Sequence, residues 1–260
     1  IKAFYKKYYT AKNAMITIVG NLSNDEARAI SQRISQGLPE GSMAKAIAMP
    51  KKTENTLTLH TPFKSQQTTV LIGAVGVKKG SPLFFPLLVG NQILGGSGLN
   101  SLLFNEVRKE RGLAYGANSG FSTYANAGTF IMSTKTRSEK TDETIKVMNE
   151  TLQNFVQNGP TPEQLDAAKK YLTGSFPLSF ANNASKLDIL NMIAFYHLPK
   201  GYLDTYTKNI EQITGKDIQA AFKEVIAKNK LLTVTVGDAS EAPKPDPLTD
   251  INVKVPSSAS

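Results

Sequence analysis

The segment Leu102–Tyr124 (LLFNEVRKERGLAYGANSGFSTY) places a helix, a turn and a strand in direct succession, and this order strongly constrains the fold. Apolar residues recur at helical spacing in its first half, which predicts an amphipathic helix. We expect Gly112 to end the helix, because glycine adopts the left-handed C-terminal conformation at the lowest cost. Arg108 then lies in the last helical turn and Tyr115 at the start of the strand, on one edge of a sheet-and-helix unit. This arrangement suits binding of a peptide carbonyl or carboxylate.

Further strands and helices are predicted on both sides of this segment. The strand at 66–77 is nearly all apolar after its first residues, so we expect it at the centre of a sheet. The strand at 128–136 is expected to form a hairpin with the segment across Ala125 and Asn126. Caps and apolar periodicity predict the remaining elements, which are strands at 56–60 and 231–236 and helices at 81–94, 138–158, 161–174, 181–196, 202–213 and 216–228. Ser81 and Ser138 are expected to cap the first two of these helices, although Pro86 should restrict the true start of the first. Thr161 and Gln164 are expected to form a capping box at the start of the third.

The N-terminal residues 1–37 predict a helix, an apolar buried strand at 14–20 and a second helix capped by Ser23. Because three elements are too few to bury a hydrophobic core alone, we expect them to pack against another domain. The order helix, apolar strand, Gly-Asn/Asp occurs twice, in FYKKYYTAKNAMITIVGN and FKEVIAKNKLLTVTVGD. The repetition suggests an internal duplication in which the first copy closes an upstream half, with chance similarity as the alternative.

Composition excludes some kinds of site and leaves several partners open. The chain has no cysteine, which excludes disulfides, thiol nucleophiles and thiolate metal sites. A net charge of +9 is compatible with nucleic acid, an anionic membrane or an acidic peptide as partner. The lysines are scattered without a dense cluster, however, so a solvated surface is the simpler interpretation.

The sequence carries no visible targeting information. No apolar run approaches the roughly 20 residues of a membrane-spanning helix, so no transmembrane segment is predicted. The chain does not begin with methionine, and Ile1 to Tyr9 reads as helix interior. We therefore expect the start to be a cut through a longer protein, whose N-terminal signal is not visible, and both the bacterial periplasm and the cytoplasm stay open as compartments.

The residues of the chain do not predict a catalytic centre of its own. Its two histidines, His60 and His197, are far apart and neither has further ligands at local spacing, whereas a catalytic zinc needs three protein ligands. We therefore expect no metal and no catalytic residue in this chain. The loop Gly95–Gly98 lacks the Gly-Lys-Ser/Thr of a phosphate-binding loop, so no nucleotide site is predicted.

Five blocks along the chain together resemble the non-catalytic C-terminal half of the pitrilysin/insulinase-type zinc metallopeptidase family. They occur in the order YYTAKNAMITIVGNLS, NQILGGSGLNSLLFNEVRKERGLAYGANSGF, FIMSTKTRSEKTDETI, AKKYLTGSFPLSFANNASKL and LLTVTVGD. The resemblance implies an α+β fold, with helices packed on one face of a mixed, largely antiparallel sheet. Residues 55–239 would form this complete half-domain, 1–37 the tail of a preceding homologous half, 38–54 a linker and 240–260 a disordered tail.

The resemblance also implies a division of labour between the two halves. In the family the N-terminal half carries zinc on a His-x-x-Glu-His motif, and the C-terminal half supplies an arginine and a tyrosine seven residues apart that help to hold the substrate. Arg108 and Tyr115 have this separation, whereas Arg111 does not. The chain is then expected to be inactive alone and to need an N-terminal catalytic half, on the same polypeptide or a separate subunit, that brings zinc to a peptide or unfolded protein.

Two alternatives remain open at the level of sequence. The chain could belong to a non-catalytic subunit or scaffold protein of the same family. It could instead be a basic module that binds nucleic acid, although it lacks interleaved aromatic and basic residues of the kind such modules use, and we expect no nucleic-acid partner.

Overall fold

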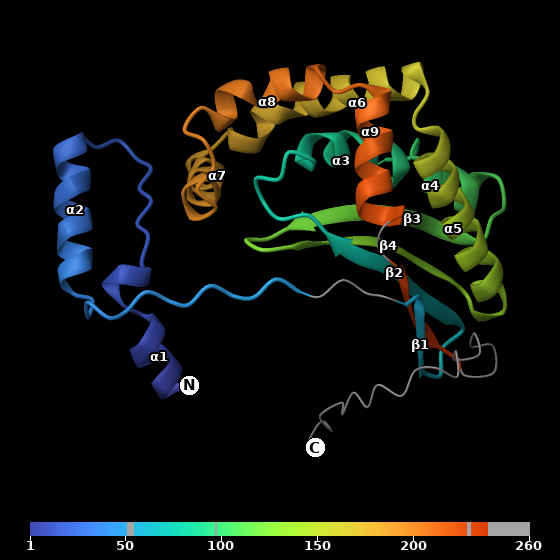
Figure 1. The fold of residues 1–260 in the computed structure, drawn as a ribbon, viewed down its shortest axis with the longest axis horizontal. Helices are drawn as coiled ribbons and strands as arrows, with labels where there is room; N and C mark the ends of the chain where they lie inside the picture. Colours follow the sequence, from blue (N-terminus) through green and yellow to red (C-terminus); the bar gives the residue numbers. More distant parts are fainter. Residues whose placement is uncertain (51–54, 97, 228–229, 239–260) are drawn as a thin grey trace.

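A computed structural model describes residues 1–50, 55–96, 98–227 and 230–238. Residues 1–50 form an N-terminal arm, and the rest of the described chain is built around a single mixed sheet (Figure 1). The described strands have the order β1-β5-β2-β4-β3, so the predicted central strand is central. β1 pairs in parallel with β5, and the other neighbours are antiparallel. The strands are β1 Leu57–Pro62, β2 Gln67–Gly76, β3 Ala114–Thr123, β4 Gly128–Arg137 and β5 Leu232–Gly237.

The helices that follow β2 lie over one face of this sheet, as the α+β interpretation predicted (Figure 1). Alternate residues of the strands point toward them, so that Val70, Ile72, Phe130 and Met132 are fully buried. The helical segments of this layer are α3 Phe84–Asn91, η2 Gln92–Gly96, α4 Leu102–Phe104, η3 Asn105–Lys109, η4 Ser138–Lys140, α5 Thr141–Asn158, α6 Pro162–Ser175, η5 Phe176–Phe180, α7 Asn183–Phe195, α8 Tyr202–Glu211, α9 Gly215–Phe222 and η6 Lys223–Ala227.

Phe222 lies at the centre of the core between sheet and helices. Its ring contacts those of Phe155, Phe121 and Phe130 at centroid separations of 5.0, 5.7 and 6.5 Å, each near edge-to-face. This geometry is the favoured one for aromatic pairs. α9 approaches α3 closely at this point, because Gly90 offers no side chain to keep Phe222 away.

The opposite face of the sheet has no helix over it among the described residues. Its apolar side chains are accordingly accessible: Leu59, Leu71, Ile131 and Val236 are each between 38% and 41% exposed. These residues occupy the alternate strand positions, so the pleat of the sheet separates a buried set from an accessible set.

The N-terminal arm differs from the sequence prediction. Its helices α1 Lys2–Tyr8 and α2 Asn24–Gln36 form, with a short turn η1 at Ala11–Asn13, and α2 begins with the predicted Ser23 cap, whose side chain pairs reciprocally with Glu26. The buried strand predicted at 14–20 is wrong, because these residues are extended but have no strand partner and are only half-buried or exposed. A strand needs a neighbouring strand to satisfy its backbone groups, and none of the described strands lies beside it.

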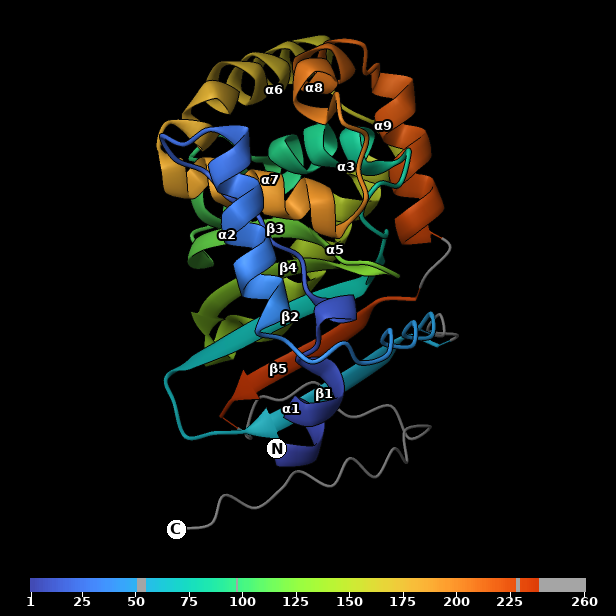
Figure 2. The same cartoon turned by 90° about the vertical axis from the view of Figure 1, so that its left-hand side faces the viewer.

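Figure 2 views the molecule with α2 in front of α7. The extended segment meets α7 through a hydrogen bond of 3.3 Å from the hydroxyl of Thr17 to the side-chain oxygen of Asn191. No residue of α1, α2 or α7 is buried. The arm therefore contributes little to the core of the sheet-and-helix unit.

Helix starts show two further differences. Ser81 was predicted to cap a helix whose start Pro86 should restrict, and α3 begins only at Phe84. A proline at position 86 clashes with the carbonyl group four residues earlier if that residue is helical. Ser138 opens a short 3-10 turn, and α5 begins after it at Thr141. The capping box at Thr161 and Gln164 is confirmed. The predicted disordered tail, 240–260, lies outside the described residues.

The close approach of α9 to α3 predicts opposite effects for two glycine-to-alanine changes. A Cβ at Gly90 would lie 2.5 Å from the ring of buried Phe222, whereas one at Gly174, an exposed residue of α6, would meet nothing within 4 Å. We expect Gly174→Ala to stabilise the protein by about 0.5–1 kcal/mol through helix propensity, and Gly90→Ala to destabilise it by about 1–3 kcal/mol through overpacking. Urea denaturation of both variants tests this, and equal stabilisation would contradict the packing described for α3 and α9.

Candidate functional site

Arg108 lies on a helix that is irregular where the arginine occurs. α4 begins after Ser101, whose hydroxyl accepts a hydrogen bond of 3.4 Å from the backbone N–H of Phe104. It continues directly into η3, a π-helical turn in which the N–H of Glu110 donates to the carbonyl of Asn105 five residues earlier. π-helical turns within α-helices occur frequently at functional sites. Val107 points into the core and is fully buried, which leaves Arg108 at the half-exposed edge of the helix.

Gly112 ends this helix in the left-handed conformation, with φ of 58°, as predicted. Its N–H donates to the carbonyl of Arg108 at 3.0 Å, and the N–H of Leu113 donates to that of Val107 at 2.9 Å. Leu113 is buried and fixes the far side of the turn. The chain therefore reverses toward the sheet within a few residues, with both sides of the turn held by hydrogen bonds.

β3 begins with a bulge that contains Tyr115. Ala114 pairs with Thr136 and Ala117 with Thr134, so two residues of β3 lie opposite one residue of β4. The hydroxyl of Thr134 donates to the carbonyl of Gly116 at 2.7 Å, which satisfies a backbone group that the ladder leaves free. Bulges are frequent beside active sites, where they redirect a side chain. Here Tyr115 is 84% exposed, on the accessible side of the sheet.

These two irregular segments bring Arg108 and Tyr115 into contact. The guanidinium carbon of Arg108 lies 4.2 Å from the ring centroid of Tyr115 and 5.1 Å from that of Phe104, both within cation–π range. Arg108 makes no hydrogen bond or ion pair with any described residue. Its N–H donors are therefore available to a ligand, while its position is fixed by the two rings.

Arg111, the other arginine considered from the sequence, is engaged elsewhere. Its guanidinium forms an ion pair with Glu106 and donates to the backbone carbonyl of the same residue at 3.0 Å. Both side chains are about half-exposed, so the pair contributes little to stability. The pair does, however, occupy N–H donors of the Arg111 guanidinium, whereas those of Arg108 have no described partner.

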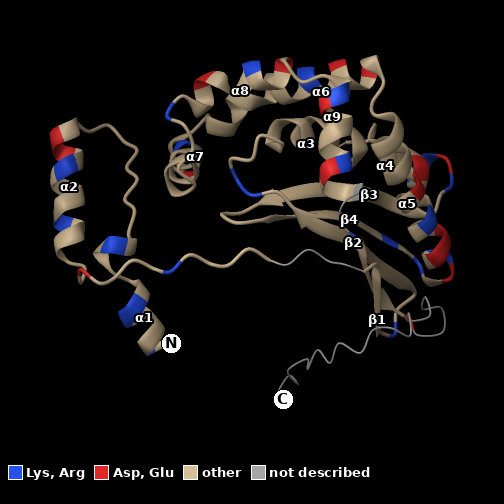
Figure 3. Ribbon diagram, viewed as in Figure 1, with Lys and Arg blue, Asp and Glu red and all other residues tan. Residues whose placement is uncertain are grey.

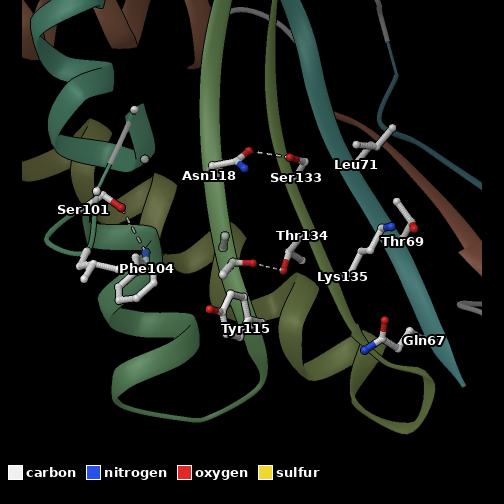
Figure 4. Close-up of a pocket in the computed structure, with 16 residues that line it drawn as sticks. Gln67, Thr69, Leu71, Ser101, Phe104, Tyr115, Asn118, Ser133, Thr134 and Lys135 are labelled. Carbon is white, nitrogen blue, oxygen red and sulfur yellow. Dashed lines mark hydrogen bonds between the residues drawn. The ribbon is translucent and has the colours of Figure 1, made fainter.

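Tyr115 stands at the wall of an open cleft of about 800 Å³ on the accessible side of the sheet (Figure 4). Strands β2, β3 and β4 supply its floor, and the glycine-containing loop before α4 supplies one side. The described residues that line it are Gln67, Thr69, Leu71, Gly95, Gly96, Gly98, Leu99, Ser101, Phe104, Tyr115, Gly116, Ala117, Asn118, Ser133, Thr134 and Lys135. The lining is polar and apolar in mixture, which suits a peptide rather than a purely apolar ligand.

The glycine loop packs against the free edge of β3. A Cβ at Gly95 would lie 2.6 Å from the backbone nitrogen of Ser119, so only glycine permits this approach. The side-chain amide of Asn91 donates to the carbonyl of Ser119 at 3.2 Å, and the hydroxyl of Ser119 donates to the side-chain oxygen of Asn91 at 2.8 Å. These close contacts give Gly95 a packing role at the sheet edge.

Sequence reasoning singled out Arg108 and Tyr115 as expected substrate-binding residues, and it did not single out the polar residues that β2, β3 and β4 contribute. Gln67, Asn118 and Lys135 also line the cleft. The alternation of side chains along β4 could have identified Lys135. Phe130 and Met132 are buried, so Ile131 and Lys135, at the intervening positions, lie on the accessible face.

None of the described groups with a shifted pKa lines the cleft, and the two considered next lie in or beside the helical layer. Burial, reinforced by neighbouring Tyr206, raises the pKa of Tyr202 to about 12. Burial also lowers the pKa of Lys79, whose ammonium lies 5.3 and 5.7 Å from the rings of Phe84 and Tyr196. These groups belong to an aromatic cluster that joins α3 to α7 and α8, and they are a feature of packing.

The histidines do not provide a zinc site. Nδ1 of His60 lies 2.8 Å from the hydroxyl of Thr235, and its buried Nε2 has no partner among the described residues. His197 follows α7 with a positive φ of 51°. Within the described ranges, no three or more His, Cys, Asp or Glu side chains come together as metal ligands would. The donor set of the described chain therefore does not fit the zinc that the resemblance implies for the family.

Charged residues are dispersed over the molecule. Figure 3 shows lysines and arginines on α1, α2, the strands and the helical layer, with acidic residues interspersed on α2, α5, α6 and α8. Of the helices in the described ranges, none is both long enough and apolar enough to cross a membrane.

Comparison with curated proteins gives relatives named as zinc proteases and one named as a non-peptidase homolog. An uncharacterized zinc protease of Bacillus subtilis is 27% identical over 187 residues, which is 72% of this chain and 45% of that protein. A non-peptidase homolog of Helicobacter pylori is 26% identical over 247 residues, which is 92% of this chain and 55% of that protein. The chain spans about half the length of these relatives.

Comparison with solved structures and family models agrees with the fold. A crystal structure of the peptidase M16 inactive domain from Pseudomonas fluorescens matches with a TM-score of 0.87 at 35% identity, over 94% of this chain and 58% of that one. A family model described as the peptidase M16 inactive domain matches residues 1–172. The resemblance to a non-catalytic metallopeptidase half is thereby confirmed, and the chain belongs to the peptidase M16 inactive domain family.

Proposed function

We propose that the chain is the substrate-holding half of a zinc metallopeptidase, in which Arg108 and Tyr115 bind the backbone of an extended peptide while a catalytic half supplies zinc. The observation that carries the proposal is the pairing of the Arg108 guanidinium with the Tyr115 ring at the wall of the open cleft. The hydrogen-bond donors of Arg108 are not used by any other described residue, and the Tyr115 side chain is accessible.

Each side chain has a distinct part in this proposal. The hydroxyl of Tyr115 donates one hydrogen bond to the carbonyl oxygen of the bond to be cleaved, and this bond strengthens as negative charge develops on that oxygen. The planar guanidinium of Arg108 presents several N–H donors to neighbouring peptide carbonyls or to a carboxylate. The ring contact between the two side chains positions both groups before the peptide arrives, which lowers the entropy lost on binding.

We also propose that residues 1–37 are the tail of a preceding homologous half-domain, that 38–54 link it to this unit and that 55–239 form the complete half-domain. The absence of buried residues in α1 and α2 supports this division. So does the extended apolar segment at 14–20, whose backbone groups lack a strand partner among the described residues. A strand of the catalytic half would satisfy those groups.

A scaffold or non-catalytic subunit is the second candidate function. It is favoured by the Helicobacter pylori relative, which is named a non-peptidase homolog and matches 92% of this chain. The test is whether the protein that contains this half cleaves peptides when its partner half is present. Nucleic-acid binding has less support, because acidic residues are interspersed among the basic ones on several helices (Figure 3).

Tyr115→Phe in the complete enzyme is expected to lower kcat by about 100-fold or more, with a smaller change in KM, because one oxyanion donor is lost. Steady-state cleavage of a fluorogenic peptide measures both constants. Tyr124→Phe is the matched control, since Tyr124 is also exposed but lies just after the end of β3, and it should retain activity. An unchanged kcat/KM for a folded Tyr115→Phe enzyme would rule out the proposed role.

Arg108→Ala is expected to lower kcat/KM by about 10- to 100-fold, the range that corresponds to losing a hydrogen bond to a charged group. Arg108→Lys should recover only part of this loss, because an ammonium lacks the planar fork. Arg111→Ala serves as the control, as its guanidinium is already paired with Glu106. Equal losses for Arg108→Ala and Arg111→Ala would show that the effect is structural.

The chain without its catalytic half is expected to hold no stoichiometric zinc. The described residues include no group of three or more His, Cys, Asp or Glu side chains that could bind the metal together. Elemental analysis after dialysis against a weak chelator measures the bound metal. A content near one tightly held zinc per chain would overturn the assignment of zinc to the partner half.

A further inference from the structure

Lys135 is an accessible cation in the cleft beside Tyr115. On β4 it lies between Thr134 and Thr136, which pair with the two ends of the bulge in β3, so it stands opposite the bulged residues. It pairs with Thr69 on β2, and its side chain extends over the open face toward that strand (Figure 4). Lys135 and Tyr115 therefore border the same floor of the cleft, from neighbouring strands.

The charge of Lys135 is not balanced locally. Of the described residues that line the cleft, Lys135 alone is charged at neutral pH, and none is an aspartate or glutamate. Its ammonium forms no ion pair or hydrogen bond with any described residue. By contrast Arg137, the next accessible position along β4, pairs with Glu139 at 3.3 Å, and Lys140 pairs with Glu143 at 2.9 Å. Arg108, a second cation, does not line the cleft itself but contacts the ring of its lining residue Tyr115.

We propose that Lys135 selects a peptide with an aspartate or glutamate in the segment that lies across β2 and β4, next to the bond held at Tyr115. The inference rests on the proposed function and names a preference of its substrate. Charge complementarity supports it, because an acidic side chain in this cleft meets the Lys135 ammonium and no carboxylate among the described lining residues. A basic side chain at the same place would meet repulsion only, so the cleft discriminates in both directions.

The neighbouring groups suit a carboxylate as well as a charge contact. Gln67 and Thr69 on β2 and Asn118 on β3 line the same floor and offer side-chain hydrogen-bond donors. Because Lys135 is exposed, the gain is that of a solvent-accessible ion pair rather than a buried one. We expect a preference of up to about five-fold, which corresponds to the upper range for accessible ion pairs, and a loss of preference at high ionic strength.

The experiment uses the complete protein with its catalytic half and two quenched fluorogenic peptides that differ only by glutamate or glutamine in the segment beside the cleaved bond. Binding is measured in parallel by fluorescence anisotropy, using the same peptides under conditions that prevent turnover. Wild-type protein should prefer the glutamate peptide, Lys135→Gln should abolish the preference, and Lys135→Glu should reverse it. Lys223→Gln, a change at an exposed lysine of the helical layer, should leave the preference unchanged.

The two measurements separate the inference from the proposed function. Cleavage of both peptides with equal kcat/KM in wild type and Lys135→Gln would overturn the role of Lys135 and leave the peptidase proposal intact. A Lys135-dependent preference in binding without any cleavage would support the acidic-peptide site and count against peptidase activity. A loss of preference in Lys223→Gln as large as that in Lys135→Gln would attribute the effect to total charge and overturn the site.

Discussion

The one-sided burial of the sheet is the constraint on which the other features depend. Helices cover the face that carries Phe130 and Met132, so alternate side chains of β4 are committed to the core and the intervening ones are left accessible. A strand cannot slip by one residue without exchanging these two sets. The register of β2 and β4 therefore fixes which polar side chains reach the cleft. On the helical face, the contact of Phe222 with Phe130 of β4 stabilises that register.

Two local departures from regular structure then create the site on this rigid base. The π-helical turn and the left-handed Gly112 direct Arg108 to the edge of its helix, and the bulge at the start of β3 turns Tyr115 toward the same place. The buried neighbours Val107 and Leu113 anchor the backbone on both sides of the turn. Regular elements supply stability here, while the irregular ones place the side chains that are free to interact.

Much of this could be predicted from the sequence, because the signals were local. Gly112, the hairpin and the capping box at Thr161 each depend on residues within a few positions of one another, and all are confirmed. The strand expected at 14–20 failed because pairing depends on a distant strand that no local pattern specifies. The spacing of Arg108 and Tyr115 could be read from the sequence, but their contact depends on the bulge, and bulges leave no reliable mark in a single sequence.

The contacts between Asn91 and Ser119 have a consequence for self-association. β3 is an edge strand, and an exposed edge can recruit strands from other molecules and begin aggregation. The side-chain amide of Asn91 donates to a carbonyl at the middle of this edge, and the backbone of Gly95 lies against the adjacent N–H. A foreign strand cannot pair continuously along β3 past this point. The side chain of Asn91 and the absence of a side chain at Gly95 thus protect the edge of β3 against pairing with strands of other molecules.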